Sequence, residues 1–304
     1  MGAVSGAPRV SAIIPTLNGA ATLPPLLAAL GRERAAGRGL AEVVAIDSGS
    51  RDGTVGLLAA AGARVLDLGG ARFGHGSARN RAAAAATGDV LLFLTQDVEP
   101  VGDGWLPPLL EGLADAGVAG TFGRQLPRGA SAEETFLARV NYGGRPRRLT
   151  AADLAAAFGP GTTLFSSAFG VVRRSAWAAI PFPDVVMSED QAWAMASLRA
   201  GWEIRYEPRA EAYHGHRFGL ARAFRRNFDS GSSLQQLGLA RGSWRAGAAH
   251  LVRELRWIAA QHGGGAVAHA VLYESVRMMG FQCGRLERVL PRPVARALGE
   301  APRG

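Results

Sequence analysis

The first hundred residues alternate short apolar runs with stretches of helical spacing, and this pattern limits the fold more than any other feature of the chain. The apolar runs predict strands at residues 10–14, 43–46, 64–68 and 90–94. The stretches between them predict helices at residues 22–30, 54–61 and 76–86. Strands that alternate with helices pair in parallel and are joined by right-handed crossovers. The sequence therefore predicts a Rossmann-like α/β fold, in which helices flank a mainly parallel sheet.

Polar residues directly follow three of these predicted strands. They are Pro15-Thr16-Leu17-Asn18, Asp47-Ser48-Gly49 and Gln96-Asp97. In open α/β sheets, ligands bind beyond the carboxyl ends of the strands. We therefore expect the three clusters to line one binding site.

The second half of the chain is first irregular and then helical. After an irregular segment at 125–165, the expected elements are strands at 165–173 and 202–206 and a helix at 189–200. Pro208 is expected to turn the chain toward His214-Gly215-His216. From about Leu220 onward, the sequence predicts helices with arginine-rich faces.

Composition excludes several classes of protein. The single cysteine, Cys283, cannot form an internal disulfide and is typical of a reducing compartment. The chain has no apolar stretch long enough to predict a transmembrane helix and no signal-peptide pattern. RNA-binding signatures are missing, and no Gly-x-Gly-x-x-Gly follows the first strand. A nucleic-acid-binding protein and a dinucleotide oxidoreductase are therefore disfavoured.

The net charge of +9 comes entirely from arginine, because the chain contains no lysine. A basic surface attracts phosphates, nucleic acid or anionic lipid. Arginine in place of lysine is also typical of a GC-rich genome, although this does not explain the excess of positive charge.

Two acids stand where predicted strands end. Asp47 could accept hydrogen bonds from a nucleobase or a ribose, and Asp97 could bind a divalent cation beside substrate phosphates. Structural roles are the alternative, since Asp-Ser-Gly-Ser is ordinary turn composition and Asp97 could cap a helix near Trp105.

Three further groups carry candidate chemistry. Glu189 and Asp190 begin a predicted helix, where acids complement the macrodipole and where one acid could also act as a base. His214 and His216, two residues apart on an extended segment, share one face and could contact a metal, a phosphate or an acceptor. Arg79 could reach a phosphate or nucleobase. A solvated or core position remains the alternative for the histidines, and a solvated helix face is the alternative for Arg79.

Taken in order, these motifs resemble the family 2 glycosyltransferases of the A-type fold. The matching segments are Ile13-Ile14-Pro15-Thr16-Leu17-Asn18, Ile46-Asp47-Ser48-Gly49-Ser50-Arg51-Asp52-Gly53-Thr54, Gly76-Ser77-Ala78-Arg79-Asn80, Phe93-Leu94-Thr95-Gln96-Asp97, Ser188-Glu189-Asp190-Gln191 and His214-Gly215-His216. Within the family, the chain is most similar to bacterial rhamnosyltransferases, through Phe73-Gly74-His75-Gly76, Thr95-Gln96-Asp97, residues 224–231 and Leu290-Pro291. The similarity covers roughly residues 9–299.

The resemblance implies a role for each candidate residue. Nucleotide and donor binding is assigned to Pro15, Thr16, Asn18, Asp47, Ser48, Arg79 and Gln96. Asp190 resembles the catalytic base, and Asp97 and His214 resemble the ligands of a divalent cation, Mg²⁺ or Mn²⁺. Glu189, Trp193 and His216 are candidate contacts of the acceptor or of phosphate. Many relatives have an acid where Thr95 stands, so only one carboxylate is left for the cation.

The resemblance also implies a reaction. The chain is expected to move a sugar, with inversion, from a nucleoside diphosphate to a hydroxyl group. The expected donor is dTDP-L-rhamnose, and the expected acceptor is a cell-envelope or lipid-linked saccharide. A UDP-hexose donor and a non-catalytic nucleotide-binding module are the alternatives. The expected location is cytoplasmic, with peripheral attachment to the inner face of the plasma membrane.

The expected domains are a disordered lead at 1–8, a glycosyltransferase domain at 9–218 and a helical region at 219–304 for acceptor, membrane or dimer contacts. In the helical region, Arg222, Arg225 and Arg226 share a face, Phe224 and Phe228 pair at i, i+4, and Trp244 and Trp257 could sit at an interface. Such helices can lie on anionic lipid, and they can equally pack on the core or on a second subunit.

Overall fold

A mixed sheet of nine strands forms the centre of the computed structural model, which describes residues 8–69, 73–156, 163–239 and 244–300. The strands are β1 Val10–Thr16, β2 Leu40–Asp47, β3 Arg64–Asp67, β4 Val90–Leu94, β5 Glu99–Pro100, β6 Val118–Leu126, β7 Arg147–Leu149, β8 Phe169–Arg173 and β9 Glu203–Tyr213. Their order across the sheet is β3-β2-β1-β4-β8-β6-β9-β5, and β7 pairs with β9.

The half of the sheet built from the N-terminal segment is parallel. Strand β1 pairs in parallel with β2 and β4, and β2 pairs in parallel with β3. Strand β8 then runs antiparallel between β4 and β6, whereas β6 and β9 are again parallel. The prediction of a mainly parallel, mixed α/β sheet is confirmed. The carboxyl ends of β1, β2 and β4 consequently meet at one edge.

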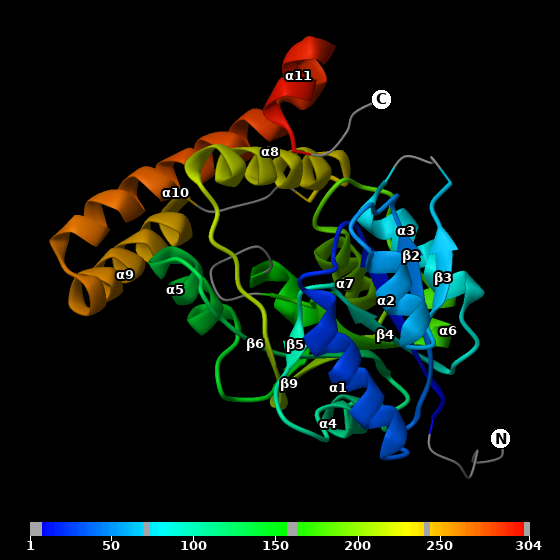
Figure 1. The fold of residues 1–304 in the computed structure, drawn as a ribbon. Helices are drawn as coiled ribbons and strands as arrows, with labels where there is room; N and C mark the ends of the chain where they lie inside the picture. Colours follow the sequence, from blue (N-terminus) through cyan, green and yellow to red (C-terminus); the bar gives the residue numbers. More distant parts are fainter. Residues whose placement is uncertain (1–7, 70–72, 157–162, 240–243, 301–304) are drawn as a thin grey trace.

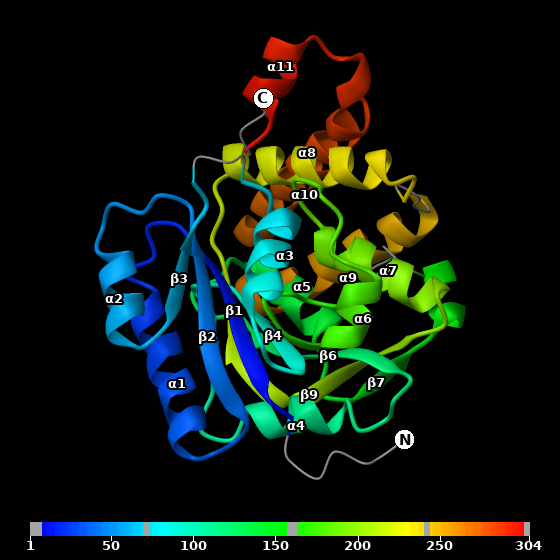
Figure 2. The same ribbon diagram turned by 90° about the vertical axis from the view of Figure 1, so that its right-hand side faces the viewer.

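Helices cover both faces of this sheet. They are α1 Leu23–Ala35, α2 Thr54–Ala60, α3 His75–Ala85, α4 Leu106–Glu111, α5 Ala132–Asn141, α6 Arg174–Ala179 and α7 Glu189–Arg199. Side chains of β1 alternate between the two layers: Ile14 belongs to the core cluster under α1, α2 and α4, and Ile13 to the cluster under α3, α6 and α7. Figure 2 shows α1 and α2 on one side of the strands and α3 and α7 on the other.

The C-terminal region is helical, as predicted. It contains α8 Leu220–Gln236, α9 Trp244–His262, α10 Gly264–Arg285 and α11 Arg292–Leu298, with α8 lying above the sheet domain in Figure 1. Glycines allow α8 and α10 to pack closely, since a β-carbon at Gly284 would overlap the carbonyl oxygen of Phe228. Phe228 is fully buried and therefore serves this packing rather than an interface with lipid. Among the described residues, no helix combines the length and apolarity needed to span a membrane.

Three expectations differ from the structure. Pro208 does not end its strand: β9 continues to Tyr213, and a break in register between Gly123 and Arg124 leaves Pro208 outside the pairing with β6. A bulge tolerates proline because the missing N–H is not needed there. Part of the segment predicted to be irregular forms helix α5. The helix predicted at residues 22–30 begins at Leu23 and extends to Ala35. The predicted lead at 1–8 lies almost wholly outside the described residues.

Candidate active site

The ends of β1 and β2 hold a carboxylate that is already saturated with hydrogen bonds. Oδ1 of Asp47 accepts hydrogen bonds from Thr16 Oγ1 (3.0 Å) and Ser50 Oγ (2.6 Å). Its Oδ2 accepts from the backbone N–H groups of Gly49 (2.9 Å) and Ser50 (2.7 Å). Burial alone would raise the pKa of Asp47, but these hydrogen bonds outweigh it and hold the pKa below its usual value. Asp47 is therefore a fixed negative charge that shapes the loop after β2.

Gln96 ties the loop after β4 to the loop after β1. Its Oε1 accepts from the backbone N–H of Leu17 at 2.9 Å, and its Nε2 donates to the carbonyl of Leu17 at 3.1 Å. Asn18, whose φ of 47° is tolerated by asparagine, donates its N–H to Ser50 Oγ at 2.8 Å. The predicted nucleotide-binding residues at these three strand ends thus lie together, and Pro15 and Ser48 belong to the same two strand ends.

Asp97, His214 and His216 form the one cluster of potential metal ligands found among the described residues. Nε2 of His214 lies 3.6 Å from Oδ1 of Asp97, and Nδ1 of His216 lies 3.8 Å from Oδ2. One potential ligand atom from each of the three residues lies within 4.8 Å of the others. A carboxylate with two imidazoles fits Mn²⁺ better than Mg²⁺, which prefers oxygen ligands. His216, expected to contact acceptor or phosphate, thus lies within the cluster of potential metal ligands.

Gln125 orients His214 through the ring nitrogen that does not face Asp97. Its Oε1 lies 2.7 Å from Nδ1 of His214, and its Nε2 donates to Ser166 Oγ at 2.7 Å. Because an amide oxygen only accepts, Nδ1 carries the proton and the lone pair of Nε2 faces Asp97. Burial lowers the pKa of His214, so the ring is neutral and able to bind a metal near pH 7. Nothing in the sequence singles out Gln125 except that it is a polar residue in a buried strand.

Asp190 lies in the first turn of α7, with its carboxylate held by the segment before β8. Its Oδ2 accepts from the backbone N–H of Ser167 at 3.2 Å, and its Oδ1 accepts from the N–H of Gln191 at 2.8 Å. Burial, followed by the nearby charge of Glu189, raises the pKa of Asp190 to about 6. A carboxyl group of this kind can take up a proton near neutral pH, as a general base must.

The helix start at Asp190 is strained. Ser188 has a φ of 62°, in the left-handed region that non-glycine residues seldom adopt, and its hydroxyl makes no capping hydrogen bond to α7. Such conformations persist only where the surrounding contacts impose them. Here the N–H of Met187, the residue before Ser188, donates to Ser233 Oγ of α8 at 3.1 Å, so the C-terminal region helps to fix the backbone next to Ser188.

Neighbouring residues connect the two groups. Ser166 bonds to Gln125, which holds His214, and Ser167 bonds to Asp190. His214, which lies beside Asp97, and Asp190 are thereby linked to adjacent residues of one segment. The arrangement can hold a cation and an ionisable acid on one site.

Three predicted contacts lie beneath this site instead of on it. Arg79 is 3% exposed, and its Nη1 pairs with Oε1 of the equally buried Glu189 at 2.8 Å. Trp193 is fully buried, and its Nε1 donates to the carbonyl of Ile180 at 2.9 Å. Because its side chain is buried, Arg79 does not fit the expected role of a donor contact. The buried side chains of Glu189 and Trp193 likewise do not fit the expected contacts with acceptor or phosphate. Their side chains support the start of α7.

Arg226 of α8 approaches the site from the C-terminal region. Its guanidinium lies 4.8 Å from the ring centre of Phe218, which stacks on His216 with ring centres 4.9 Å apart. Its positive charge contributes to lowering the pKa values of His75, His214 and His216, after burial as the main cause. The sequence indicated this arginine only as part of a basic helical face.

Comparison with protein families identifies the chain's relatives. Residues 11–179 match the family described as glycosyl transferase family 2. The chain is 30% identical over 228 residues to the O-antigen chain rhamnosyltransferase RfbN of Salmonella typhimurium, covering 73% of this chain and 71% of that protein. It is 31% identical over 194 residues to the O-antigen chain rhamnosyltransferase WbaN of Salmonella anatum, covering 62% and 61%.

Solved structures share the fold. A mannosyltransferase from Pyrobaculum calidifontis, in complex with GDP-Man and Mn²⁺, matches with a TM-score of 0.63 and 19% identity, covering 95% of this chain and 89% of that one. Glucosyl-3-phosphoglycerate synthase from Mycobacterium tuberculosis, in complex with Mn²⁺, UDP-glucose and phosphoglyceric acid, matches with a TM-score of 0.53 and 22% identity, covering 77% and 81%. At these identities, the similarity establishes an A-type architecture.

Proposed function

This chain belongs to glycosyl transferase family 2, and from that premise we propose that it transfers a sugar from a nucleoside diphosphate to a hydroxyl group with inversion at the anomeric carbon. The observation that carries the proposal is the anchoring of two groups to adjacent residues: Ser166 reaches the Asp97–His214–His216 cluster through Gln125, and Ser167 holds Asp190.

In the proposed single displacement, Asp190 removes the proton of the acceptor hydroxyl. The acceptor oxygen forms a bond to the anomeric carbon, while the bond from that carbon to the diphosphate oxygen breaks on the opposite face. Asp97 and His214, with His216 beside them, are proposed to hold the divalent cation, Mn²⁺ or Mg²⁺. A bound cation offsets the negative charge of the departing diphosphate. Arg226 is proposed to add further positive charge that also offsets the charge of the diphosphate.

The proposed donor is dTDP-L-rhamnose, and the proposed acceptor is a cell-envelope or lipid-linked saccharide. Support for both comes from the two Salmonella rhamnosyltransferases, which act on O-antigen chains. A UDP-hexose remains the alternative donor, because the loops after β1 and β2 contain no group specific for a deoxysugar. A non-catalytic nucleotide-binding module is the alternative of a different class.

A thermal-shift panel tests the donor. Nucleoside diphosphates and their sugars are added with and without Mn²⁺, and a ligand that binds only the native state raises Tm. We expect the largest rise with dTDP-rhamnose plus Mn²⁺, and slow metal-dependent release of dTDP without an acceptor. A larger rise in Tm with a UDP-sugar would identify that sugar nucleotide as the donor in place of dTDP-rhamnose. Binding without any release of the nucleoside diphosphate would favour the non-catalytic module.

The raised pKa of Asp190 predicts the pH dependence of the reaction. The base must be ionised, so kcat/KM should fall about tenfold per pH unit below a midpoint near 6, which is the pKa of this carboxyl group. Steady-state rates measured from about pH 4.5 to 8 give the midpoint. Donor affinity is measured in the same buffers, because protonation of other groups in the site would act on binding. A midpoint near 4, as for an ordinary carboxyl group, would contradict this role.

Peripheral membrane binding is proposed for the C-terminal helices. Leu272, Met279 and Leu286 recur every seven positions on one face and are 50%, 54% and 58% exposed. Arg288 and Arg292 lie exposed just beyond them. Apolar side chains beside arginines suit the surface of an anionic bilayer.

Flotation with liposomes tests this attachment. We expect the protein to float with vesicles that contain anionic lipid and to remain unbound with neutral vesicles. Met279→Glu places a negative charge on the apolar face, which the anionic lipid repels, and it should therefore weaken flotation. Equal recovery with both kinds of vesicle would contradict a role for anionic lipid, and no flotation at all would favour packing against a second subunit.

A further inference from the structure

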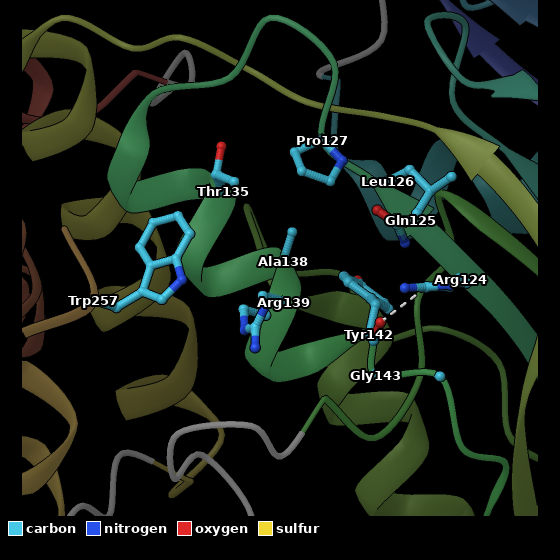
Figure 3. Close-up of a pocket in the computed structure, with 11 residues that line it drawn as sticks. Arg124, Gln125, Leu126, Pro127, Thr135, Ala138, Arg139, Tyr142, Gly143 and Trp257 are labelled. Atoms are coloured by element: carbon cyan, nitrogen blue, oxygen red, sulfur yellow. Dashed lines mark hydrogen bonds between the residues drawn. The ribbon is translucent and has the colours of Figure 1, made fainter. Parts of the chain in front are cut away.

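A cavity of about 450 Å³ lies between α5, the end of β6 and α9. Its lining includes Gln125, Thr135, Arg139, Tyr142 and Trp257, which Figure 3 shows around one hollow. A volume of this order is typical of sites for small ligands. None of the predicted donor-binding residues lines it.

Aromatic and hydrogen-bonding groups share the walls of this cavity. Trp257 of α9 is half-buried and packs on Phe136 with ring centres 5.6 Å apart, which fixes its orientation. Arg139 of α5 is exposed, and no ion pair involving it is found among the described residues. A flat aromatic ring beside free hydrogen-bond donors matches a sugar, which has an apolar ring face and polar edges.

The cavity adjoins the candidate active site through a shared side chain. Gln125 lines the cavity and also contacts Nδ1 of His214 at 2.7 Å. Tyr142 lines it as well, and the negative charge of Asp190 adds to the effect of burial in raising the pKa of Tyr142 to about 12. A molecule in this cavity would therefore contact Gln125, the side chain that orients His214.

We propose that this cavity binds a saccharide unit of the acceptor, away from the hydroxyl that reacts. The proposal rests on the proposed transferase function and adds a role for the C-terminal region, because Trp257 belongs to α9. Binding energy from a remote unit of this kind positions the reacting hydroxyl.

A glycan array of bacterial surface oligosaccharides, probed with the full chain, tests this assignment. We expect wild-type protein to bind a subset of the glycans, and Trp257→Ala and Arg139→Ala to bind the same subset at least about tenfold more weakly. Trp257→Phe, which keeps an aromatic face, should restore most of the binding. Arg256→Ala is the matched control, since Arg256 is an exposed arginine of α9 outside the cavity lining.

Donor binding separates this proposal from the proposed function. All four variants should keep the Tm shift that the wild type shows with dTDP-rhamnose and Mn²⁺, which also shows that they are folded. Unchanged glycan binding by Trp257→Ala would overturn the assignment, as would a wild type that binds no glycan. Loss of vesicle binding in this variant, with glycan binding intact, would also overturn it and assign the cavity to lipid.

Discussion

Substituting Asp190 with asparagine is expected to lower kcat by about 10²–10⁴-fold while leaving the protein folded, because this is the usual contribution of a positioned base. The amide has the shape of the carboxylate, and its oxygen can still accept the N–H of Ser167. It cannot take up the acceptor proton. The loss should therefore appear in kcat, measured at saturating donor and acceptor, with little change in the affinity for the donor.

Asp184→Asn is the matched control. Asp184 is an exposed acid six positions before Asp190, so the same chemical change there should leave kcat near the wild-type value. Melting curves of both variants establish that they are folded. A rate for Asp190→Asn within about twofold of the wild type would remove Asp190 from the role of base.

The parallel half of the fold could be predicted because its signals are local. The strands β1, β2 and β4 are mainly apolar, and a polar cluster marks the end of each. Parallel pairing then brings the carboxyl ends of β1, β2 and β4 to one edge whatever the details of packing. The grouping of Thr16, Asp47 and Gln96 follows from that topology.

Contacts between distant segments could not be predicted in this way. Arg79 and Glu189 are 110 positions apart, and each belongs to a helix start where a solvated charge is equally plausible from sequence. Their burial follows from the packing of α3 against the segment before α7, where a β-carbon at Gly76 would overlap the carbonyl oxygen of Pro183. Trp193, expected to contact the acceptor or phosphate, lies in the core for the same reason.

The position of Pro208 shows a different limit. A proline is a sound signal for a turn because it lacks the N–H of a strand ladder. The bulge in β9 removes that requirement locally, so the strand continues to Tyr213 and delivers His214 to the edge of the sheet. A bulge depends on the partner strand, and a single segment of sequence does not encode it.

Replacing Asp97 with alanine is expected to abolish the gain in donor affinity that Mn²⁺ provides. Asp97 supplies the one carboxylate of the ligand cluster, since the nearby residue 95 is a threonine whose hydroxyl is buried. Losing a residue that only orients a metal ligand typically costs about 10–100-fold in metal affinity, so losing the carboxylate ligand itself should cost at least as much.

Calorimetry of donor binding with and without Mn²⁺ measures this effect. The wild type should bind dTDP-rhamnose more tightly with the metal, whereas Asp97→Ala should give the same Kd in both conditions. Asp103→Ala is the control, because Asp103 is an exposed acid that pairs with Arg32 and is not part of the ligand cluster. An undiminished metal effect in Asp97→Ala would show that the cation is held elsewhere. Gln125 orients His214 so that its Nε2 faces this carboxylate, an orientation that suits metal binding. An undiminished metal effect would show that this orientation does not serve to bind the cation.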